Sequence, residues 1–331
     1  MRTASIAGMV LALLASPSAA HQASLPVGAC LNAGNHLEFE RENFYGGKVL
    51  GADDFQRMRA AGFETVRIPV RWSHKTGGAP DHAIEEEWMV RVEQVVDAAL
   101  AADLNVILDS HNFEELNSGP QQAAPKLAAI WRQVGARFAN HSERLWFELA
   151  NEPNDAFGNA NLVATLAPSL AAIRETNPGR AVIIGGGDWS NVDSLATLDL
   201  PDDPHVHPTF HYYDPFDFTH QGAEWAGPPV PAHTRRYGRP EDAERLLNDK
   251  EKVRAYTRRT GMVPFIGETG AFDETTQLSD RIAFHSAVTQ ALGPEVSGVC
   301  AWAYTNTFHF WDHDAQAWIP GLRAAMGLPE D

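Results

Sequence analysis

Short apolar runs alternate with longer amphipathic stretches along most of this chain. Within the runs almost every position is apolar or β-branched, a pattern typical of strands that are covered on both faces. Each run is followed by turn residues or charged residues, so each is predicted to be a strand. The predicted strands are Gly28–Asn32, Thr65–Val70, Asn105–Ser110, Leu145–Asn151, Ala181–Gly186, Pro208–Tyr213, Val263–Glu268 and Gly298–Ala303.

The stretches between these runs have the period of helices. Regular alternation of strand and helix indicates parallel strands with helical crossovers, and eight such units over about 300 residues are typical of a (β/α)8 TIM barrel. An open doubly wound sheet is the alternative, but no G-x-G-x-x-G motif follows the first strand. The sequence therefore predicts an α/β protein with one barrel domain. Its predicted helices are Ala52–Ala61, Glu85–Ala102, Ala123–Asn140, Leu162–Thr176, Pro240–Thr260 and Leu278–Leu292.

The loops after the fifth and sixth predicted strands depart most from this regular plan. Residues 214–233 (DPFDFTHQGAEWAGPPVPAH) form a long segment rich in aromatic residues, proline and histidine. Residues 185–187 are three glycines, which more often make a tight turn than a ligand-binding loop. Long loops that follow barrel strands lie on the face where barrels bind their ligands, so residues 214–233 are predicted to shape a binding surface.

Two glutamates lie at the ends of apolar runs. Glu152 ends a run that reads LWFELANEP, and Glu268 lies in VPFIGETG. Burying a carboxylate at the end of an apolar strand is unfavourable unless its charge is matched or used. Because the carboxyl ends of all barrel strands meet on one face, both glutamates are predicted to face one cleft. Such a pair is suited to acid/base and nucleophilic work on one bond.

Other polar and aromatic side chains are predicted at the same ends of the strands. Each one alone has a structural explanation, since a surface arginine, a capping histidine or a core tryptophan is common. Their occurrence together at the ends of six of the eight predicted strands is hard to assign to packing. The set is Arg67, His111, Asn151, Glu152, His211, Tyr213, Glu268 and Trp302.

The motifs that carry this set resemble those of glycoside hydrolase family 5, whose members are retaining (β/α)8 hydrolases with glutamates on strands 4 and 7. The resemblance extends from about Gly28 to Trp302, and its specificity lies in the order of the motifs. These are NEP at 151–153, GETG at 267–270, VRIP at 66–69, HYY at 211–213 and a cellulase-like opening, LNAGNHLE, at 31–38.

The resemblance implies a role for each glutamate. Glu152 would be the general acid/base and Glu268 the nucleophile of a retaining mechanism, with the two carboxyl groups about 5 Å apart. Arg67 and the hydroxyl of Tyr213 would keep Glu268 ionised. His211 would lie near Glu152 and help to set its protonation.

The same resemblance implies a set of sugar contacts. Asn151 would bind the 2-hydroxyl, His111 would contact hydroxyls at the same subsite, and Trp302 would lie under the sugar ring. Trp189 and Trp225 are predicted to extend the cleft, with core or surface packing as the alternative for each.

Several further side chains are weaker candidates. Glu148 is predicted to be a buried structural acid at the opposite end of its strand from Glu152. Trp311 is a third tryptophan that could extend the cleft. The possible polar contacts are His36, Glu38, His220 and Gln221.

The activity that fits the resemblance is endo-acting hydrolysis of β-1,4-glucan, as in an endoglucanase. Mannan, xyloglucan and other β-glucans remain alternatives, because substrate choice depends on the loops. A noncatalytic periplasmic glycan-binding barrel is an alternative from another class, although such a protein would not need both glutamates. A serine hydrolase is excluded because no G-x-S-x-G motif is present.

Composition and charge narrow the possible partners. The 331 residues carry a net charge of −17, which argues against nucleic acid and anionic membranes as partners. The fourteen histidines include no H-E-x-x-H motif, so no metal and no cofactor is expected. We expect a monomer that binds oligo- or polysaccharide β-glucan.

The first twenty residues are predicted to be a signal peptide. Ile6–Ala15 (IAGMVLALLA) is apolar but too short to span a bilayer, and small residues then precede His21. A retained N-terminal anchor is the alternative. Cleavage would leave a catalytic barrel domain over residues 21–331, exported to the periplasm or the medium.

The chain has two cysteines, Cys30 and Cys300. They belong to the first and last predicted strands, which are neighbours in a closed barrel. In an exported protein they could form a disulfide, and two buried free thiols are the alternative.

Overall fold

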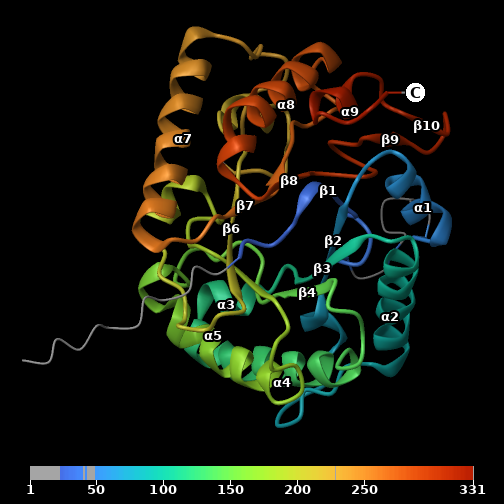
Figure 1. Cartoon of the computed structure of the whole chain (residues 1–331), viewed down its shortest axis with the longest axis vertical. Helices are drawn as coiled ribbons and strands as arrows, with labels where there is room; N and C mark the ends of the chain where they lie inside the picture. Colours follow the sequence, from blue (N-terminus) through green and yellow to red (C-terminus); the bar gives the residue numbers. More distant parts are fainter. Residues whose placement is uncertain (1–22, 40–41, 43–48, 228, 331) are drawn as a thin grey trace, which may run out of the picture.

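Eight parallel strands close into a barrel whose order follows the sequence in the computed structural model (Figure 1). The structure describes residues 23–39, 42, 49–227 and 229–330. The predicted (β/α)8 barrel with a single domain is confirmed. Its strands are β1 (Gly28–Asn32), β2 (Thr65–Val70), β3 (Asn105–Ser110), β4 (Leu145–Glu148), β5 (Val182–Gly185), β6 (Val206–His211), β7 (Phe265–Thr269) and β8 (Gly298–Ala301).

Helices and short turns of helix connect the strands and surround the barrel in Figure 1. A two-stranded antiparallel hairpin follows β8 and was not predicted from the sequence. It consists of β9 (Trp311–Asp312) and β10 (Ala317–Trp318). The helices are α1 (Ala52–Ala60), α2 (Glu86–Ala101), α3 (Glu114–Ser118), α4 (Pro120–Arg137), α5 (Asn159–Arg174), α6 (Phe216–Thr219), α7 (Pro240–Thr260), α8 (Leu278–Leu292) and α9 (Leu322–Ala325), with 3₁₀ turns at Trp72–Lys75, Val192–Ala196 and Gly293–Glu295.

The ends of α7 show how local sequence sets these elements. The Asp242 carboxylate accepts hydrogen bonds from the backbone N–H groups of Gly238 and Arg239, both at 2.9 Å. Pro240 starts the helix, where its missing N–H leaves no donor unsatisfied. The helix ends at Gly261, whose φ of +75° is unstrained because glycine has no Cβ.

The observed strands differ from the predicted ones mainly at their carboxyl ends. β4 stops at Glu148, although the extended run to Asn151 was predicted as strand. Leu149 and Asn151 still donate backbone hydrogen bonds to Ile183 and Ser110, at 3.1 and 2.9 Å. The chain therefore leaves the regular ladder while staying attached to both neighbouring strands, and it then turns into the site.

A disulfide joins the first and last strands of the barrel. Cys30 of β1 and Cys300 of β8 are opposite one another in the parallel register, and the structure has a bond between them. The alternative of two buried free thiols is therefore wrong. The bridge lies in a cluster of apolar side chains that includes Trp146, Ile183 and Phe265.

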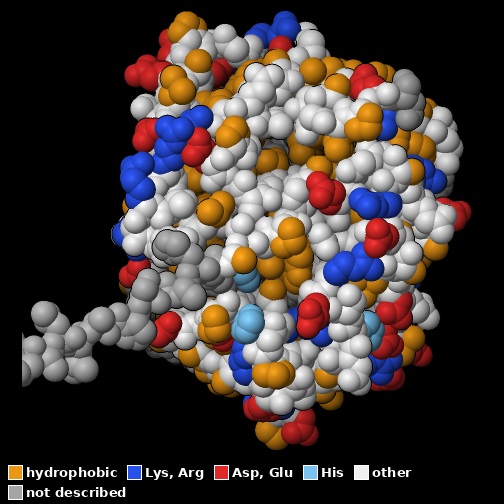
Figure 2. Space-filling view, in the orientation of Figure 1, with side chains coloured by type: hydrophobic (Ala, Val, Ile, Leu, Met, Phe, Trp, Pro, Cys, Tyr) orange, Lys and Arg blue, Asp and Glu red, His pale blue; other side chains and the backbone are white. Residues whose placement is uncertain are grey.

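The predicted signal peptide, residues 1–20, lies outside the described residues. Within the described ranges, none of the helices combines the length and apolar character that a membrane crossing requires. On the face shown in Figure 2, acidic side chains are interspersed with basic ones, and hydrophobic side chains are exposed near the middle.

Candidate active site

Glu152 and Glu268 lie close together at the carboxyl ends of β4 and β7. A carboxylate oxygen of each and a ring nitrogen of His211 all lie within 4.8 Å of one another. Glu152 has a φ of +47°, a left-handed conformation that is uncommon without glycine and concentrated at functional sites. Its side chain is 26% exposed, whereas that of Glu268 is 6% exposed. The two carboxyl groups therefore share a site but differ in access to solvent.

Arg67 connects the two sides of this site from the interior of the barrel. It was predicted at the end of β2 but lies within the strand, fully buried, and its long side chain extends to the glutamates. Its Nη1 donates to Glu268 Oε1 at 2.6 Å, while Nε and Nη2 donate to the two oxygens of Glu148 at 2.7 and 2.8 Å. Its remaining acceptors are the side-chain oxygens of Asn32, Asp109 and Asn151.

Glu148 is a buried acid, as predicted, but its predicted placement away from the site is wrong. It is the last residue of β4 and shares the guanidinium of Arg67 with Glu268. Burial raises the pKa of Glu148 and the Arg67 charge opposes that shift. A bidentate carboxylate fixes the plane of a guanidinium, so Glu148 determines which nitrogen of Arg67 faces Glu268.

The hydroxyl of Tyr213 is the second donor to Glu268. It donates to Oε2 at 2.9 Å, while Arg67 binds Oε1. Burial and the nearby Glu268 charge raise the pKa of Tyr213 well above its usual value, so the hydroxyl keeps its proton. Glu268 thus accepts one hydrogen bond on each oxygen, an arrangement suited to a carboxylate.

Glu152 has a different environment. Its Oε1 is 2.8 Å from Nδ1 of His211. Burial among protein atoms raises the pKa of Glu152 to about 7, despite the opposing effects of His111 and Arg67. Burial lowers the pKa of His211 to about 4, so this imidazole is neutral near pH 7. Glu152 is therefore the group of the pair that can hold a proton near neutral pH.

His111 and Trp302 form one wall of the site. Their rings are stacked, with centroids 5.7 Å apart and an interplanar angle of 12°. Nδ1 of His111 lies 2.6 Å from Oδ2 of Asp109, which fixes the imidazole. A Cβ at Gly34 would lie 2.7 Å from the Trp302 ring, so the absence of a side chain there makes room for the indole.

Asn151 lies beside Glu152, with its side-chain oxygen occupied by Arg67. Nη2 of Arg67 donates to Asn151 Oδ1 at 2.7 Å. Because the oxygen is the acceptor, the amide nitrogen is the end of this side chain that faces the site. Its hydrogen bond lowers the pKa of Glu152 and partly offsets the effect of burial.

A cleft of about 680 Å³ opens beside Glu152 and contains both of the predicted cleft tryptophans. Trp189 is 53% exposed and Trp225 is 61% exposed. Phe216, which the sequence did not single out, is 39% exposed and lines the same cleft. These three are the aromatic members of the exposed large hydrophobic side chains in the described part of the chain. Exposed aromatic faces gathered in one cleft indicate a binding surface.

The weaker candidates separate into two groups. His220 lines the cleft and stacks on Phe216, with centroids 4.2 Å apart. Gln221 is buried and exchanges hydrogen bonds with the backbone of Arg235, so its role is structural. For Trp311, the alternative of packing is the outcome, because it is buried against Trp318 of the β9–β10 hairpin.

The two candidates that precede α1 are both buried. Glu38 accepts hydrogen bonds from the backbone N–H groups of Asn35 and His36. Nε2 of His36 lies 2.8 Å from the hydroxyl of Thr305. Burial raises the pKa of Glu38 to about 7. Glu38 therefore holds the loop after β1 in its own turn, and His36 attaches that loop to the loop after β8.

Sequence reasoning missed Asn32 and Asp109, which contact Arg67 from β1 and β3. Asn32 donates to the backbone oxygens of Gly267 and Ala301, at 2.9 and 3.2 Å, and so links β1 to β7 and β8. The available signal was a polar residue inside an apolar strand, which is informative because such a group must be matched.

Glu152, His211 and Glu268 are also residue types that ligate metals. The hydrogen bond between His211 and Glu152 and the Arg67 guanidinium at 2.6 Å from Glu268 disfavour a cation between them. The cluster therefore fits proton transfer and nucleophilic attack better than metal binding.

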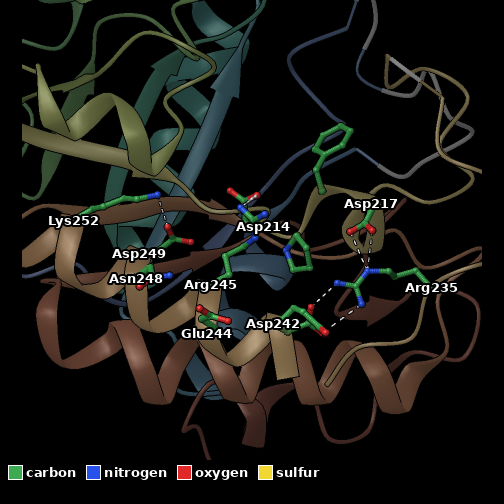
Figure 3. A pocket seen from close by; sticks show the side chains of 12 residues that line it. Asp214, Asp217, Arg235, Asp242, Glu244, Arg245, Asn248, Asp249 and Lys252 are labelled. Atoms are coloured by element: carbon green, nitrogen blue, oxygen red, sulfur yellow. Dashed lines mark hydrogen bonds and ion pairs between the residues drawn. The ribbon is translucent and has the colours of Figure 1, made fainter. Parts of the chain in front are cut away.

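A second groove of about 600 Å³ lies between α6 and α7, and Phe216 lines both this groove and the cleft beside Glu152 (Figure 3). Several of its charged side chains bind one another. Arg235 binds Asp217 and Asp242, Lys252 binds Asp249, and Arg245 binds Asp214. This network stabilises the long loop against α7.

Comparisons with known proteins agree with this geometry. A family profile described as cellulase, glycosyl hydrolase family 5, matches residues 31–307. The chain belongs to this family. Family 5 relatives include Endoglucanase H of Acetivibrio thermocellus, which is 33% identical over 267 residues that cover 80% of this chain and 28% of that protein. The chain thus spans about a quarter of the length of that relative.

Solved structures are similar over nearly the whole chain. A hyperthermophilic endo-β-1,4-glucanase in complex with substrate is 33% identical, with a TM-score of 0.87, over 91% of this family 5 chain and 97% of the other. Thermotoga maritima Cel5A in complex with mannotriose is 30% identical with the same TM-score and the same coverage.

Proposed function

We propose that this protein is a retaining, endo-acting glycoside hydrolase that cleaves β-1,4-glucan by double displacement. The observation that carries the proposal is the approach of Glu152 and Glu268 to within 4.8 Å. Retaining enzymes hold their carboxyl groups about 5–5.5 Å apart, whereas inverting enzymes leave about 6.5–9.5 Å for a water molecule. The short separation supports direct attack by one carboxylate on the anomeric carbon.

The surroundings of the two glutamates support different roles for them. Glu268, with Arg67 and Tyr213 as donors, attacks the anomeric carbon and forms a glycosyl ester. Glu152 donates its proton to the leaving oxygen in the first step. In the second step it removes a proton from the water that attacks the ester, and Glu268 leaves as a carboxylate. A pKa of about 7 suits a group that acts as acid and then as base.

The remaining site residues would bind the sugar. We assign the 2-hydroxyl to the Asn151 amide nitrogen, other hydroxyls to His111, and the apolar ring face to Trp302. Trp189 and Trp225 would bind sugars on the leaving-group side, next to Glu152. Sugar rings have apolar C–H faces, so exposed indoles in an open cleft support binding in the interior of a polymer.

The preference for β-1,4-glucan rests on relatives whose names describe endoglucanases. Hydrolysis of mannan is a second candidate, because a structural neighbour has been solved with mannotriose. Xyloglucan, other β-glucans and noncatalytic glycan binding complete the alternatives. We further propose that residues 1–20 direct export and that the mature barrel, residues 21–331, acts as a monomer in the periplasm or the medium.

Two variants test the catalytic roles. With dinitrophenyl β-cellobioside, whose leaving group needs no proton, Glu152→Ala should still release dinitrophenol in a burst and then stall as the glycosyl-enzyme. Added azide should restore turnover and give the β-glycosyl azide. Glu268→Ala should release almost nothing. Glu87→Ala, on the exposed face of α2, is the matched control. Near-normal activity of purified Glu268→Ala or Glu152→Ala on soluble cellulose derivatives would refute the assignment.

The substrate is tested by product analysis on a panel of cellulose derivatives, mixed-linkage glucan, xyloglucan and mannan. We expect a rapid fall in the viscosity of carboxymethylcellulose and short cello-oligosaccharides as products. The first-formed products should have the β configuration at the new reducing end. Faster cleavage of mannan would establish the second candidate, and binding without cleavage of any glycan would establish the noncatalytic alternative.

A further inference from the structure

Three successive residues after β5 adopt a left-handed backbone conformation although none of them is glycine. The φ angles of Asp188, Trp189 and Ser190 are +56°, +54° and +54°. In this region the Cβ approaches the following carbonyl oxygen, so L-residues normally occur there singly. A run of three is unfavourable, and such strain persists only where the surroundings impose it.

The backbone of this left-handed turn (188–190) is held by the catalytic side of the barrel. The N–H of Trp189 donates to the carbonyl of Pro153, the residue after Glu152, at 3.0 Å. The carbonyl of Ser190 accepts from the backbone N–H of His211 at 2.7 Å. The turn therefore bridges the loop that carries Glu152 and the strand that carries its imidazole partner.

Packing below the left-handed turn fixes it further. The Ser190 side chain is buried and donates to the carbonyl of Gly186 at 3.3 Å. A Cβ at Gly185 would lie 2.4 Å from Ser190 Oγ, so this glycine allows the turn to lie directly on β5. Asn191, the next residue, donates to Asp214 at 3.2 Å, on the edge of the groove in Figure 3.

The left-handed turn exposes the indole side chain of Trp189 to solvent. Trp189 is about half exposed and lines the cleft together with Glu152 and His211. An exposed tryptophan on a strained backbone gains little from burial, so core packing does not account for it. A flat side chain held rigidly beside the proton donor fits the ring of the departing sugar.

We propose that the left-handed turn is a positioning element that holds Trp189 as the platform for the leaving-group sugar, in fixed relation to Glu152. This inference rests on the proposed function and deepens it. The strain serves to keep the indole in one orientation, so that sugar binding on the leaving-group side is aligned with proton donation. Loss of rigidity should therefore impair only substrates that have a sugar in that position.

Two substitutions at Asp188 separate backbone rigidity from side-chain chemistry. Asp188→Gly and Asp188→Ala both remove the carboxylate, but only glycine adopts the left-handed region without a Cβ clash. Asp188→Gly should melt about 2 °C above Asp188→Ala. Its kcat/KM for cellopentaose should nevertheless be about 3-fold lower than that of Asp188→Ala, because glycine also permits other conformations.

β-Cellobiosyl fluoride supplies the internal reference, because its leaving group has no sugar ring. Trp189→Ala should lose about 10-fold in kcat/KM for cellopentaose and almost nothing for the fluoride. Adding Asp188→Gly to Trp189→Ala should cause no further loss, since the turn acts through the indole. Leu247→Ala, an exposed hydrophobic substitution on α7, should leave both substrates unchanged.

Two results would overturn the inference. One is equal kcat/KM for cellopentaose in Asp188→Gly and Asp188→Ala, and the other is an unchanged ratio of the two substrates in Trp189→Ala. A wild-type protein that cleaves neither substrate would instead refute the proposed function, so the two failures are distinguishable.

Discussion

Arg67 and Glu148 form a bidentate ion pair inside the barrel, with nitrogen–oxygen distances of 2.7 and 2.8 Å. Both side chains are essentially removed from water. The pair lies directly below the Glu268 carboxylate, which accepts from the same guanidinium. Glu148 therefore controls both the orientation of Arg67 and the balance of charge beneath the reacting groups.

Glu148→Gln should lower activity and move its pH dependence. Glu148 raises the pKa of Glu152, so loss of its charge should shift the alkaline limb of kcat/KM to lower pH. Breaking a buried pair usually lowers the free energy of unfolding by about 3–5 kcal/mol. We expect a smaller loss here, because Asp109 and Glu268 still compensate Arg67. Urea unfolding and a pH–rate profile measure the two effects.

Glu148→Asp is the matched control, since it keeps the charge but shortens the side chain. The alkaline limb should then stay in place while kcat falls. An unchanged limb in Glu148→Gln would contradict the electrostatic role.

The proposed acid should determine the alkaline limb of the wild-type enzyme. Because burial raises the pKa of Glu152 to about 7, kcat/KM for cellopentaose should fall as the pH rises through about 7 and the proton is lost. With dinitrophenyl β-cellobioside the first step needs no proton, so its rate should be almost independent of pH over that range. If kcat/KM falls over the same alkaline pH range with both substrates, the role of Glu152 as the acid is contradicted.

Removing the disulfide should lower stability with little effect on catalysis. The bridge joins residues 270 positions apart, and a cross-link of a long loop typically contributes about 2–4 kcal/mol. The double variant Cys30→Ala and Cys300→Ala should therefore melt several degrees lower, with near-normal kcat at 25 °C. In reductant, the wild-type protein should have the same melting temperature as the variant. If the oxidised wild type and the variant have equal melting temperatures, the prediction is contradicted.

Gly270→Ala should disturb the platform formed by Trp302. A Cβ at Gly270 would lie 2.4 Å from the carbonyl oxygen of Trp302 and 3.0 Å from the Phe308 ring. The resulting shift should reduce the free energy of unfolding by about 1–3 kcal/mol and lower kcat/KM. Gly293→Ala is the control, because that position is right-handed with nothing within 4 Å of its Cβ. Equal behaviour of the two variants would show that the close contact relaxes freely.

Much of the fold could be predicted because parallel barrel strands have continuous apolar runs. The bounds of β1, β2, β3, α7 and α8 agree with the sequence prediction. The β9–β10 hairpin could not be predicted, since strands of two residues have no periodicity to detect.

The sequence predicted which strand ends meet at the site. It did not predict which side chains contact one another there. Glu148 and Glu152 are four residues apart, and the sequence does not show that the chain turns between them. In the structure Glu148 binds Arg67 from within the ladder, whereas Glu152, beyond the ladder, contacts His211. The cysteine pair was likewise undecided, because only the register of β1 against β8 brings Cys30 opposite Cys300.

That pairing also changes what a broken peptide bond does to this molecule. The cystine converts the chain between β1 and β8 into a covalent ring that includes the long loop at 214–233. A single proteolytic cut in that loop opens the ring but releases no fragment, since each piece retains one half of the cystine. The nicked protein remains one covalently linked molecule, which suits an enzyme that, as we propose, acts in the periplasm or the medium.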